Sequence, residues 1–386
     1  MSPARILTAL LLLSVILAPA SRAQLGKNVM IPAGSDIDHQ LDAINSAAPS
    51  EKLQLIDQFS QAHSESDYQI VADEQYVNYY LNAKQYDRAF EYGEKLFSLD
   101  PDNYTNAINM VRAANEKGDT DKLFSYGEKA NSIVQRYKAA SPPPGSDPDA
   151  WMRTKNERLA GIKDDQVYVQ QSLWSAAFSV KDPAKKASDF ERFAKMYPDS
   201  PEGQQALTMA AGYYQQAQNR TKMLEVANGA LAKDPNNIGM LVLLADDYSE
   251  KGEQLDKAEA YAKKAASLTD TAQRPEGVSD DQWKQQLSVE KGLAYSALGQ
   301  VNIQKKLNAQ AVDNLTKAAP LLKPNAVSYA RNQYRLGFAY LNLKKNPEAK
   351  QAFTDAASVD SPYKGPAQQK LNELGGAKPA VRKKAS

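Results

Sequence analysis

The hexapeptide Phe90-Glu91-Tyr92-Gly93-Glu94-Lys95 returns as Phe124-Ser125-Tyr126-Gly127-Glu128-Lys129, and the two copies begin 34 residues apart. Tyr214 and Tyr248, each late in an apolar pattern with helical spacing, have the same separation. A fixed period of about 20 to 50 residues indicates stacked supersecondary units, and 34 residues suit one helix–turn–helix unit. The chain is therefore predicted to be an array of helix pairs.

Proline-centred turns occur where such pairs should end: Asp100-Pro101-Asp102-Asn103, Tyr197-Pro198-Asp199-Ser200 and Asp234-Pro235-Asn236-Asn237. Proline cannot continue a helix, and the Asp, Asn or Ser beside it can cap the next helix. No run alternates apolar and polar residues as a strand does. The fold class predicted from these patterns is all-α.

The segment from Gln333 to Pro362 resembles the tetratricopeptide repeat (TPR), which pairs Leu-Gly and Tyr on a first helix with Ala, a large apolar residue and Ala on a second. The matching residues are Leu336, Gly337, Tyr340, Ala349, Phe353 and Ala356, while Gln333 stands where the family has Trp. Weaker copies contain Tyr80, Ala89, Leu96 and Pro101; Leu244, Ala245, Tyr248, Ala258, Ala262 and Ala265; and Leu298, Gly299, Ala311, Leu315 and Ala318.

The resemblance implies an α-solenoid of about eight antiparallel helix pairs, wound as a right-handed superhelix and closed by a C-terminal capping helix. The pairs are expected at 39–63, 66–99, 103–139, 148–197, 201–233, 236–268, 279–322 and 324–359, and the capping helix at 363–374. Each pair must stack on its neighbours, because one pair cannot bury its apolar face alone. The sequence around residues 187–201 is similar to repeats of envelope-assembly and cell-division coordinator proteins.

Residues 1–23 have the layout of a secretory signal peptide: Arg5, an apolar run from Ile6 to Ala18, and a small-residue exit. Cleavage is expected after Ala23, with Ala20 as the second choice and an uncleaved anchor as the alternative. The mature protein is predicted to be exported to the periplasm or secreted. No later run is apolar enough to cross a bilayer, so no stable membrane insertion is expected after cleavage.

Two segments divide the remaining chain. The Pro-rich connection at residues 141–150, a hinge or a long turn, separates an N-terminal TPR-like block at 24–140 from a C-terminal block at 151–374. A second loop ends at Ser279-Asp280-Asp281-Gln282, which has the pattern of a capping box. Residues 375–386 carry four basic side chains and are predicted to be a disordered tail.

The composition argues against an enzyme. Among 386 residues there is no cysteine and there are two histidines, His39 and His63, and neither a phosphate-binding loop nor a dinucleotide fingerprint is present. No catalytic residue, metal ligand or cofactor is therefore predicted, although a hydrolase with carboxylates from separate helices is a remaining alternative. The 47 basic and 46 acidic side chains nearly balance, which gives no reason to expect nucleic acid as the partner.

Mapping the groove positions of the resembling family onto this chain gives ten candidate partner-binding residues: Glu74, Asn78, Asn82, Gln215, Gln216, Asp246, Glu250, Tyr334, Phe338 and Asn342. Amides suit an extended peptide backbone, and aromatic rings suit its side chains. Because Glu74 stands where a Lys would be needed, the family's clamp for a partner's C-terminal carboxylate is not expected.

These features predict a non-catalytic, exported scaffold or adaptor that binds a protein or peptide of the cell envelope along a groove. The alternative is a glycan- or cell-wall-binding helical repeat module, which the aromatic residues and the export signal also suit.

Overall fold

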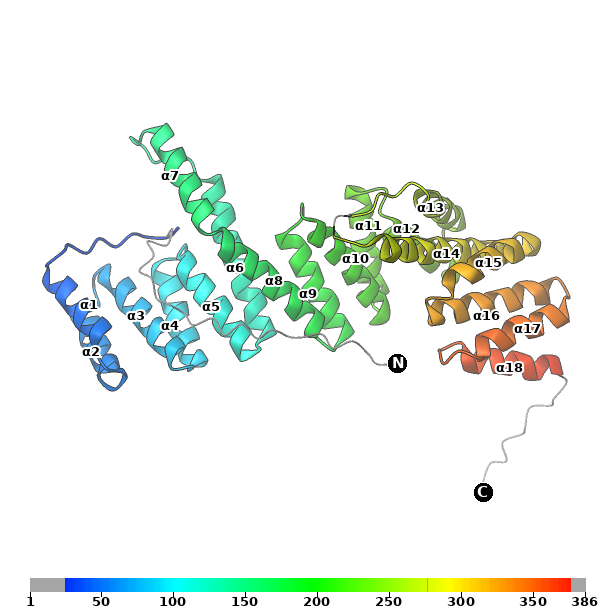
Figure 1. The fold of residues 1–386 in the computed structure, drawn as a ribbon, viewed down its shortest axis with the longest axis horizontal. Coiled ribbons are helices and arrows are strands. Elements are labelled where there is room, and N and C mark those ends of the chain that lie inside the picture. Colours follow the sequence, from blue (N-terminus) through cyan, green and yellow to red (C-terminus); the bar gives the residue numbers. More distant parts are fainter. Residues whose placement is uncertain (1–24, 276, 376–386) are drawn as a thin grey trace, which may run out of the picture. The chain divides into compact units, whose positions relative to one another are not determined.

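The computed structural model describes residues 25–275 and 277–375, in which every regular element is a helix and no strand occurs (Figure 1). Consecutive helices pack as pairs, so the predicted all-α solenoid of helix pairs is confirmed. The predicted signal peptide and residues 376–386 of the basic tail lie outside the described residues. Within the described ranges no helix combines the length and apolar character needed to span a bilayer.

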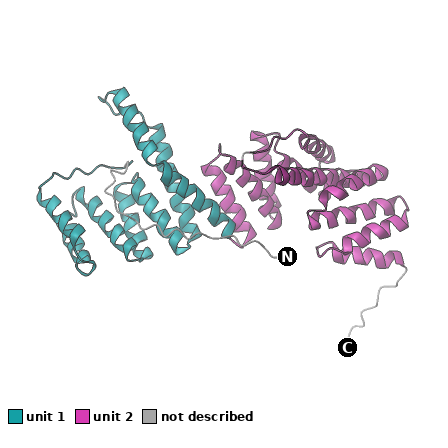
Figure 2. Ribbon diagram, viewed as in Figure 1, with its two compact units in different colours: residues 1–179 teal, residues 180–386 magenta. Residues whose placement is uncertain are grey.

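The chain forms two compact units, residues 1–179 and residues 180–386, coloured separately in Figure 2. The helices of unit 1 are α1 (Asp36–Ser46), α2 (Pro49–Ala62), α3 (Tyr68–Asn82), α4 (Tyr86–Leu99), α5 (Tyr104–Lys117), α6 (Thr120–Ala139), α7 (Pro148–Gly161) and α8 (Lys163–Ser179). Those of unit 2 are α9 (Pro183–Met196), α10 (Pro201–Gln216), α11 (Arg220–Lys233), α12 (Ile238–Lys251), α13 (Leu255–Leu268), α14 (Asp280–Gln304), α15 (Asn308–Leu322), α16 (Ala326–Asn342), α17 (Asn346–Ala357) and α18 (Lys364–Gly375).

The repeated hexapeptide performs the same packing task twice. Gly93 on α4 faces Met110 of α5, and Gly127 on α6 faces Leu173 of α8, where a Cβ would come within 2.9 Å of the leucine side chain. Any larger residue would push the neighbouring helix away. The glycine therefore lets α4 pack closely on α5 and α6 pack closely on α8, which explains why the motif recurs at the repeat period.

The turns inside the pairs also repeat. Lys84, Gln218, Lys306 and Lys344 all adopt left-handed backbone conformations, with φ between 55° and 60°. In each turn the following N–H donates to a carbonyl five residues back, as in Asn219 N to Tyr214 O at 2.9 Å. This is the bond of a helix C-terminus closed by one left-handed residue. The tyrosines at positions 80, 214, 248 and 340 all supply such an acceptor.

One predicted pair was wrong. Residues 148–197 form three helices, α7, α8 and α9, and α9 packs against α10. The break between α8 and α9 follows from Asp182, whose side chain accepts from Lys185 N at 2.7 Å, and from Pro183 in the first turn. The other seven predicted pairs each contain two helices, and α18 covers α17 as the capping helix.

The Pro-rich connection predicted at 141–150 lies inside unit 1, whereas the two units divide at residues 179 and 180. Its residues 141–147 connect α6 to α7, and residues 148–150 form the first turn of α7. Lys155 of α7 donates from Nζ to the carbonyls of Lys138 and Ala140, at 2.6 and 2.8 Å. The rings of Tyr137 and Trp151 also meet, with centroids 5.9 Å apart. These contacts hold α7 against the C-terminal end of α6 across the connection. The predicted capping box is present, since Ser279 and Gln282 each bond to the other's backbone.

Candidate functional site

The first helices of three successive pairs in unit 2, α12, α14 and α16, contribute to one pocket of about 340 Å³. We call this region the α12–α14–α16 face. Its pocket is lined by Glu250, Gln300, Ile303, Arg331, Tyr334, Arg335, Phe338, Asn342 and Tyr363, the last from the turn before α18.

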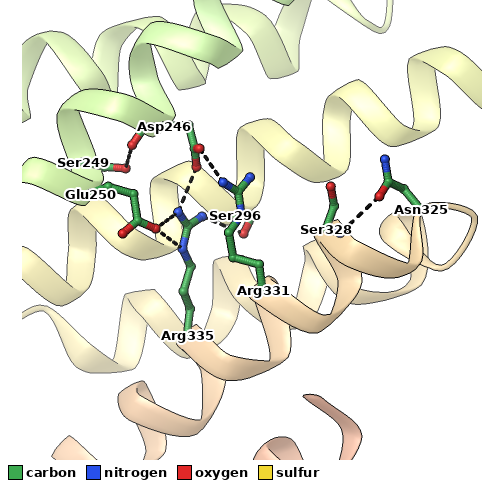
Figure 3. Close-up of polar contacts among 8 residues, drawn as sticks. All are labelled: Asp246, Ser249, Glu250, Ser296, Asn325, Ser328, Arg331 and Arg335. Carbon is green, nitrogen blue, oxygen red and sulfur yellow. Dashed lines mark hydrogen bonds and ion pairs between the residues drawn. The ribbon is translucent and has the colours of Figure 1, made fainter. Parts of the chain in front are cut away.

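A buried ion-pair cluster contributes to the lining of this pocket (Figure 3). The Asp246 carboxylate accepts from Arg331 Nη1 at 2.6 Å and from Arg335 Nη2 at 2.8 Å, although 85 and 89 residues separate them in the chain. Arg335 also donates to Ser296 Oγ at 3.0 Å and to Glu250 Oε1 through its Nε at 3.1 Å. The guanidinium of Arg335 thereby ties α16 to both α14 and α12.

The charges in the cluster are mutually neutralised. Burial alone would raise the pKa of Asp246, but the guanidinium groups of Arg331 and Arg335 outweigh it and lower that pKa below its ordinary value. Burial likewise opposes the charged form of Arg335, and Asp246 and Glu250 overcome this and raise its pKa. Asp246 and Arg335 are only 6% and 3% exposed. They are therefore charged, paired and largely hidden from a ligand.

The local sequence of α16 explains how it presents these groups. Asn325 caps the helix by accepting from Ser328 N at 3.1 Å, which sets where the first turn begins (Figure 3). From there Arg331, Arg335, Phe338 and Asn342 recur at intervals of four, three and four residues, which is one face of a helix. Small residues on another face bury against the core.

Aromatic rings also line the pocket. Tyr334 and Phe338 meet edge to face, with centroids 5.0 Å apart, and Tyr334 lies 5.7 Å from Tyr363. Phe338 also contacts the buried Phe353 of α17 at 5.5 Å. Tyr334 and Phe338 are partly exposed, so the rings are anchored in the core and still reach the pocket.

Five of the candidate residues from the sequence meet on this face: Asp246, Glu250, Tyr334, Phe338 and Asn342. Four of them line the pocket, while Asp246 lies behind its wall as the acceptor for both arginines. Asn342 is exposed and donates from Nδ2 to Asn308 Oδ1 at 3.0 Å. Sequence analysis missed Ser296, Gln300, Arg331, Arg335 and Tyr363. Arg331 and Arg335 could have been predicted from helical spacing, because they precede Phe338 and Asn342 at intervals of three and four residues and so lie on the same face of α16.

The other five candidates lie elsewhere. Gln215 and Gln216 are exposed at the C-terminal end of α10 and do not line this pocket. Glu74, Asn78 and Asn82 belong to unit 1, where they form an i, i+4 series along α3. Asn78 and Asn82 are exposed.

Glu74 is partly buried and accepts from Asn103 Nδ2 at 3.0 Å. Burial raises the pKa of Glu74, the bond from Asn103 opposes that change, and the neighbouring carboxylate of Asp100 adds to it. Glu74 thus has a structural partner at the start of α5.

Among the described residues, no group of three or more His, Cys, Asp or Glu side chains has a geometry that could hold a metal ion. His39 is exposed, and His63 shares a hydrogen bond with Gln40 Oε1 at 3.2 Å. The two histidines are therefore not brought together with carboxylates in a catalytic arrangement.

Comparison with known proteins gives similarity in structure only. No family model and no curated protein matches the chain. A thermophilic TPR protein from Thermus thermophilus is 19% identical, covering 53% of this chain and 98% of its own, with a TM-score of 0.33. The TPR domain of P58(IPK) is 12% identical, covering 89% and 99%, with a TM-score of 0.30. Yeast Tom70 is 14% identical, covering 91% and 66%, with a TM-score of 0.37. The predicted TPR resemblance is confirmed at the level of repeated helix pairs, and the exported bacterial type stays a prediction.

Proposed function

We propose that this protein is a non-catalytic, exported helical-repeat scaffold that binds an extended segment of another protein on the α12–α14–α16 face. The observation that carries the proposal is the 340 Å³ pocket, which is lined both by fixed charged groups and by partly exposed aromatic rings. Pockets of about 300 Å³ and more are large enough to take up a sizeable ligand group.

The chemistry of the pocket favours a neutral segment with an apolar anchor. Both arginines are neutralised by carboxylates within the cluster, so no unpaired cation is available for an anionic ligand. Tyr334 and Phe338 offer ring surface to a large apolar side chain, and Gln300 and Asn342 offer amides to a peptide backbone. An extended strand or loop of a protein presents both features together.

The pocket is also preorganised. Arg335 is held by bonds to three different side chains, on α12 and α14. Long side chains lose rotamer freedom when they are immobilised, and here that loss has been incurred in folding, before any ligand arrives. Binding to this pocket therefore has a smaller entropic cost than binding to a site whose side chains are mobile before the ligand arrives.

The envelope location is part of the proposal and is supported by the layout of residues 1–23. Export would remove these residues and leave a mature chain that has no cysteine and is held together by packing alone. Mass spectrometry of the intact protein purified from its own cells tests this directly. A mature N-terminus at Gln24 is expected, and a full-length chain recovered from the cytoplasm would contradict export.

The binding face is tested by site-specific photo-crosslinking in the native cells. A photoreactive phenylalanine analogue replaces Phe338 in one strain and Lys350, which is exposed on α17, in a matched control strain. We expect one or two defined proteins to crosslink through position 338 and not through position 350. Crosslinks at both positions, or none at 338, would contradict the proposal.

The same experiment addresses the second candidate function, a glycan- or cell-wall-binding module. The observation that favours it is the group of rings at Tyr334, Phe338 and Tyr363, since sugars also stack on aromatic faces. Recovery of cell-wall fragments through position 338, without protein, would replace the scaffold proposal with this one.

A further inference from the structure

Unit 1 contains a second cavity, separate from the α12–α14–α16 face, which none of the predicted groove residues lines. It has a volume of about 420 Å³ and lies among α2, α3 and α4. Gln69, Asp73 and Tyr76 line it from α3, and Tyr92, Lys95 and Leu99 line it from α4.

Asp73 is the unusual member of this cavity. It is 3% exposed, yet its one described hydrogen bond comes from a neutral amide, Gln69 Nε2, at 3.2 Å from Oδ1. It makes no ion pair among the described residues. A carboxylate removed from water is normally paired with a cation or with several donors, because burying an uncompensated charge costs several kcal/mol. Asp73 therefore retains unused capacity to accept.

The neighbouring cations are already engaged. Lys95 bonds through Nζ to Glu91 Oε1 at 3.0 Å and lies 4.2 Å from the centre of the Tyr92 ring. Arg88 is paired with the same Glu91 at 2.6 Å. The positive charge of Lys95 acts on Asp73 only from a distance. Burial dominates and raises the pKa of Asp73 to about 6, against the smaller opposing effects of the Gln69 bond and of Lys95.

The other lining residues are the rings of Tyr76 and Tyr92, the apolar Leu99, and the polar Ser60, Gln69, Lys95 and Ser98. The rings of Tyr76 and Tyr92 stack with centroids 4.1 Å apart, and the Tyr76 hydroxyl donates to Asp57 Oδ1 at 2.5 Å. Leu99 is 37% exposed at the edge. The cavity thus combines one buried carboxylate with tyrosine rings, a leucine side chain and two serines, and its one lysine is already paired with Glu91. Such a lining suits an aliphatic stem that ends in a positive charge.

We infer that the Asp73 cavity is a second binding site, which takes the alkylammonium group of a lysine side chain presented by a partner protein. The ammonium pairs with the Asp73 carboxylate, and its methylene stem lies against Leu99 and the tyrosine rings. A neutral sugar would leave the buried charge of Asp73 uncompensated, and an anion would be repelled by it. This inference does not depend on the function proposed for unit 2.

The test uses the full mature chain and a simple probe, Nα-acetyl-lysine N-methylamide, observed by saturation-transfer NMR. The matched probe is the norleucine amide, which has the same stem without the ammonium. We expect saturation of the lysine methylenes and at least tenfold weaker binding of the norleucine probe. Asp73→Asn, which keeps the shape of the side chain, should weaken binding of the lysine probe at least tenfold, while Asp87→Asn on the exposed surface of α4 should leave it unchanged.

Three results would overturn the inference. The first is equal binding of the lysine and norleucine probes. The second is unchanged binding in Asp73→Asn, whose fold is checked by its circular dichroism. The third is binding of a neutral oligosaccharide in place of the lysine probe. A further arm uses butylamine, which presents the same stem and ammonium group and should bind about as tightly as the lysine amide. At least tenfold tighter binding would assign the site to free amines and would be a fourth result against the inference.

Discussion

The buried cluster of the α12–α14–α16 face gives a prediction that can be worked out from its geometry. Asp246→Asn keeps the size of the side chain and removes one negative charge. Glu250 is then the one carboxylate left in the cluster, and it is paired with Arg335 and not with Arg331. The side chain of Arg335 is 4% exposed and cannot turn into water, whereas that of Arg331 is 20% exposed.

The expected loss of stability follows from the excess of arginines over carboxylates in the Asp246→Asn variant. Removing one member of a buried ion pair typically destabilises a protein by about 3–5 kcal/mol, because it leaves an uncompensated charge. Glu250 still serves Arg335, and Arg331 has some access to solvent, so we expect the lower end, about 3 kcal/mol. Since 1.36 kcal/mol corresponds to a factor of ten, the opening equilibrium should rise about 150-fold.

Hydrogen exchange followed by mass spectrometry measures this locally, without requiring the two units to unfold together. Peptides from α12, α14 and α16 should exchange about 150-fold faster in Asp246→Asn, while peptides from α3 to α6 in unit 1 serve as an internal reference. The matched control is Asp313→Asn, which breaks an exposed pair with Lys317 on α15. This substitution should change the free energy of opening derived from exchange by less than about 0.5 kcal/mol, because exposed ion pairs contribute little to stability.

A double variant tests whether the unpaired charge, and not disturbed packing, causes the loss of protection. Adding Arg331→Met to Asp246→Asn removes the surplus cation and should recover part of the lost protection. If the double variant exchanges as fast as the single one, the loss arises from disturbed packing and the electrostatic reasoning is refuted. Protection equal to that of the native protein in Asp246→Asn alone would refute it as well.

Two further predictions concern a glycine and a pH dependence. Gly337→Ala should destabilise unit 2 by about 1–3 kcal/mol in urea unfolding, because a Cβ at this position comes within 2.6 Å of the Phe353 ring. The control, Gly212→Ala, lies in open space on α10 and should stabilise unit 2 by up to about 1 kcal/mol. Equal effects of the two substitutions would contradict the close packing of Gly337 on Phe353. Burial raises the pKa of Asp73 from 3.8 to about 6, so the folded chain holds this proton more tightly and unit 1 should lose about 2 kcal/mol of stability as pH rises from 4 to 7, a loss absent in Asp73→Asn. Protection factors of α3 peptides, corrected for the pH dependence of intrinsic amide exchange, check this at the two pH values, and equal protection factors in the native protein would contradict it.

The sequence predicted the helix pairs well because the repeat leaves local marks. Each turn depends on residues that are close together in the sequence. This holds for the proline-centred breaks and for the turns whose carbonyl acceptors are Tyr80, Tyr214, Tyr248 and Tyr340. The prediction was wrong at residues 148–197, where α7 and α8 are separated at Ile162 by a break without proline. A turn of that kind has no strong sequence signal, and three helices were therefore counted as two.

The α12–α14–α16 face was predicted less completely, for a different physical reason. Glu250, Tyr334, Phe338 and Asn342 could be placed by their position within one repeat. The partners of Asp246 could not, because Arg331 and Arg335 lie 85 and 89 residues away and pairing at that range depends on how repeats stack. Asp246 was consequently expected to bind a partner, whereas in the structure it fixes two arginines.

The structural role of Asp246 bears on how the face would recognise the segment proposed to bind there. A buried ion-pair cluster is seldom more stable than well-packed apolar residues of the same volume, so stability alone does not account for it. The cluster holds Arg335 and Arg331 in single orientations in the lining of the pocket, with their charge cancelled. A pocket built in this way discriminates by shape and by apolar contact with Tyr334 and Phe338. Variants of Phe338 should therefore change affinity without changing its dependence on salt, which is the signature that separates this face from an electrostatic one.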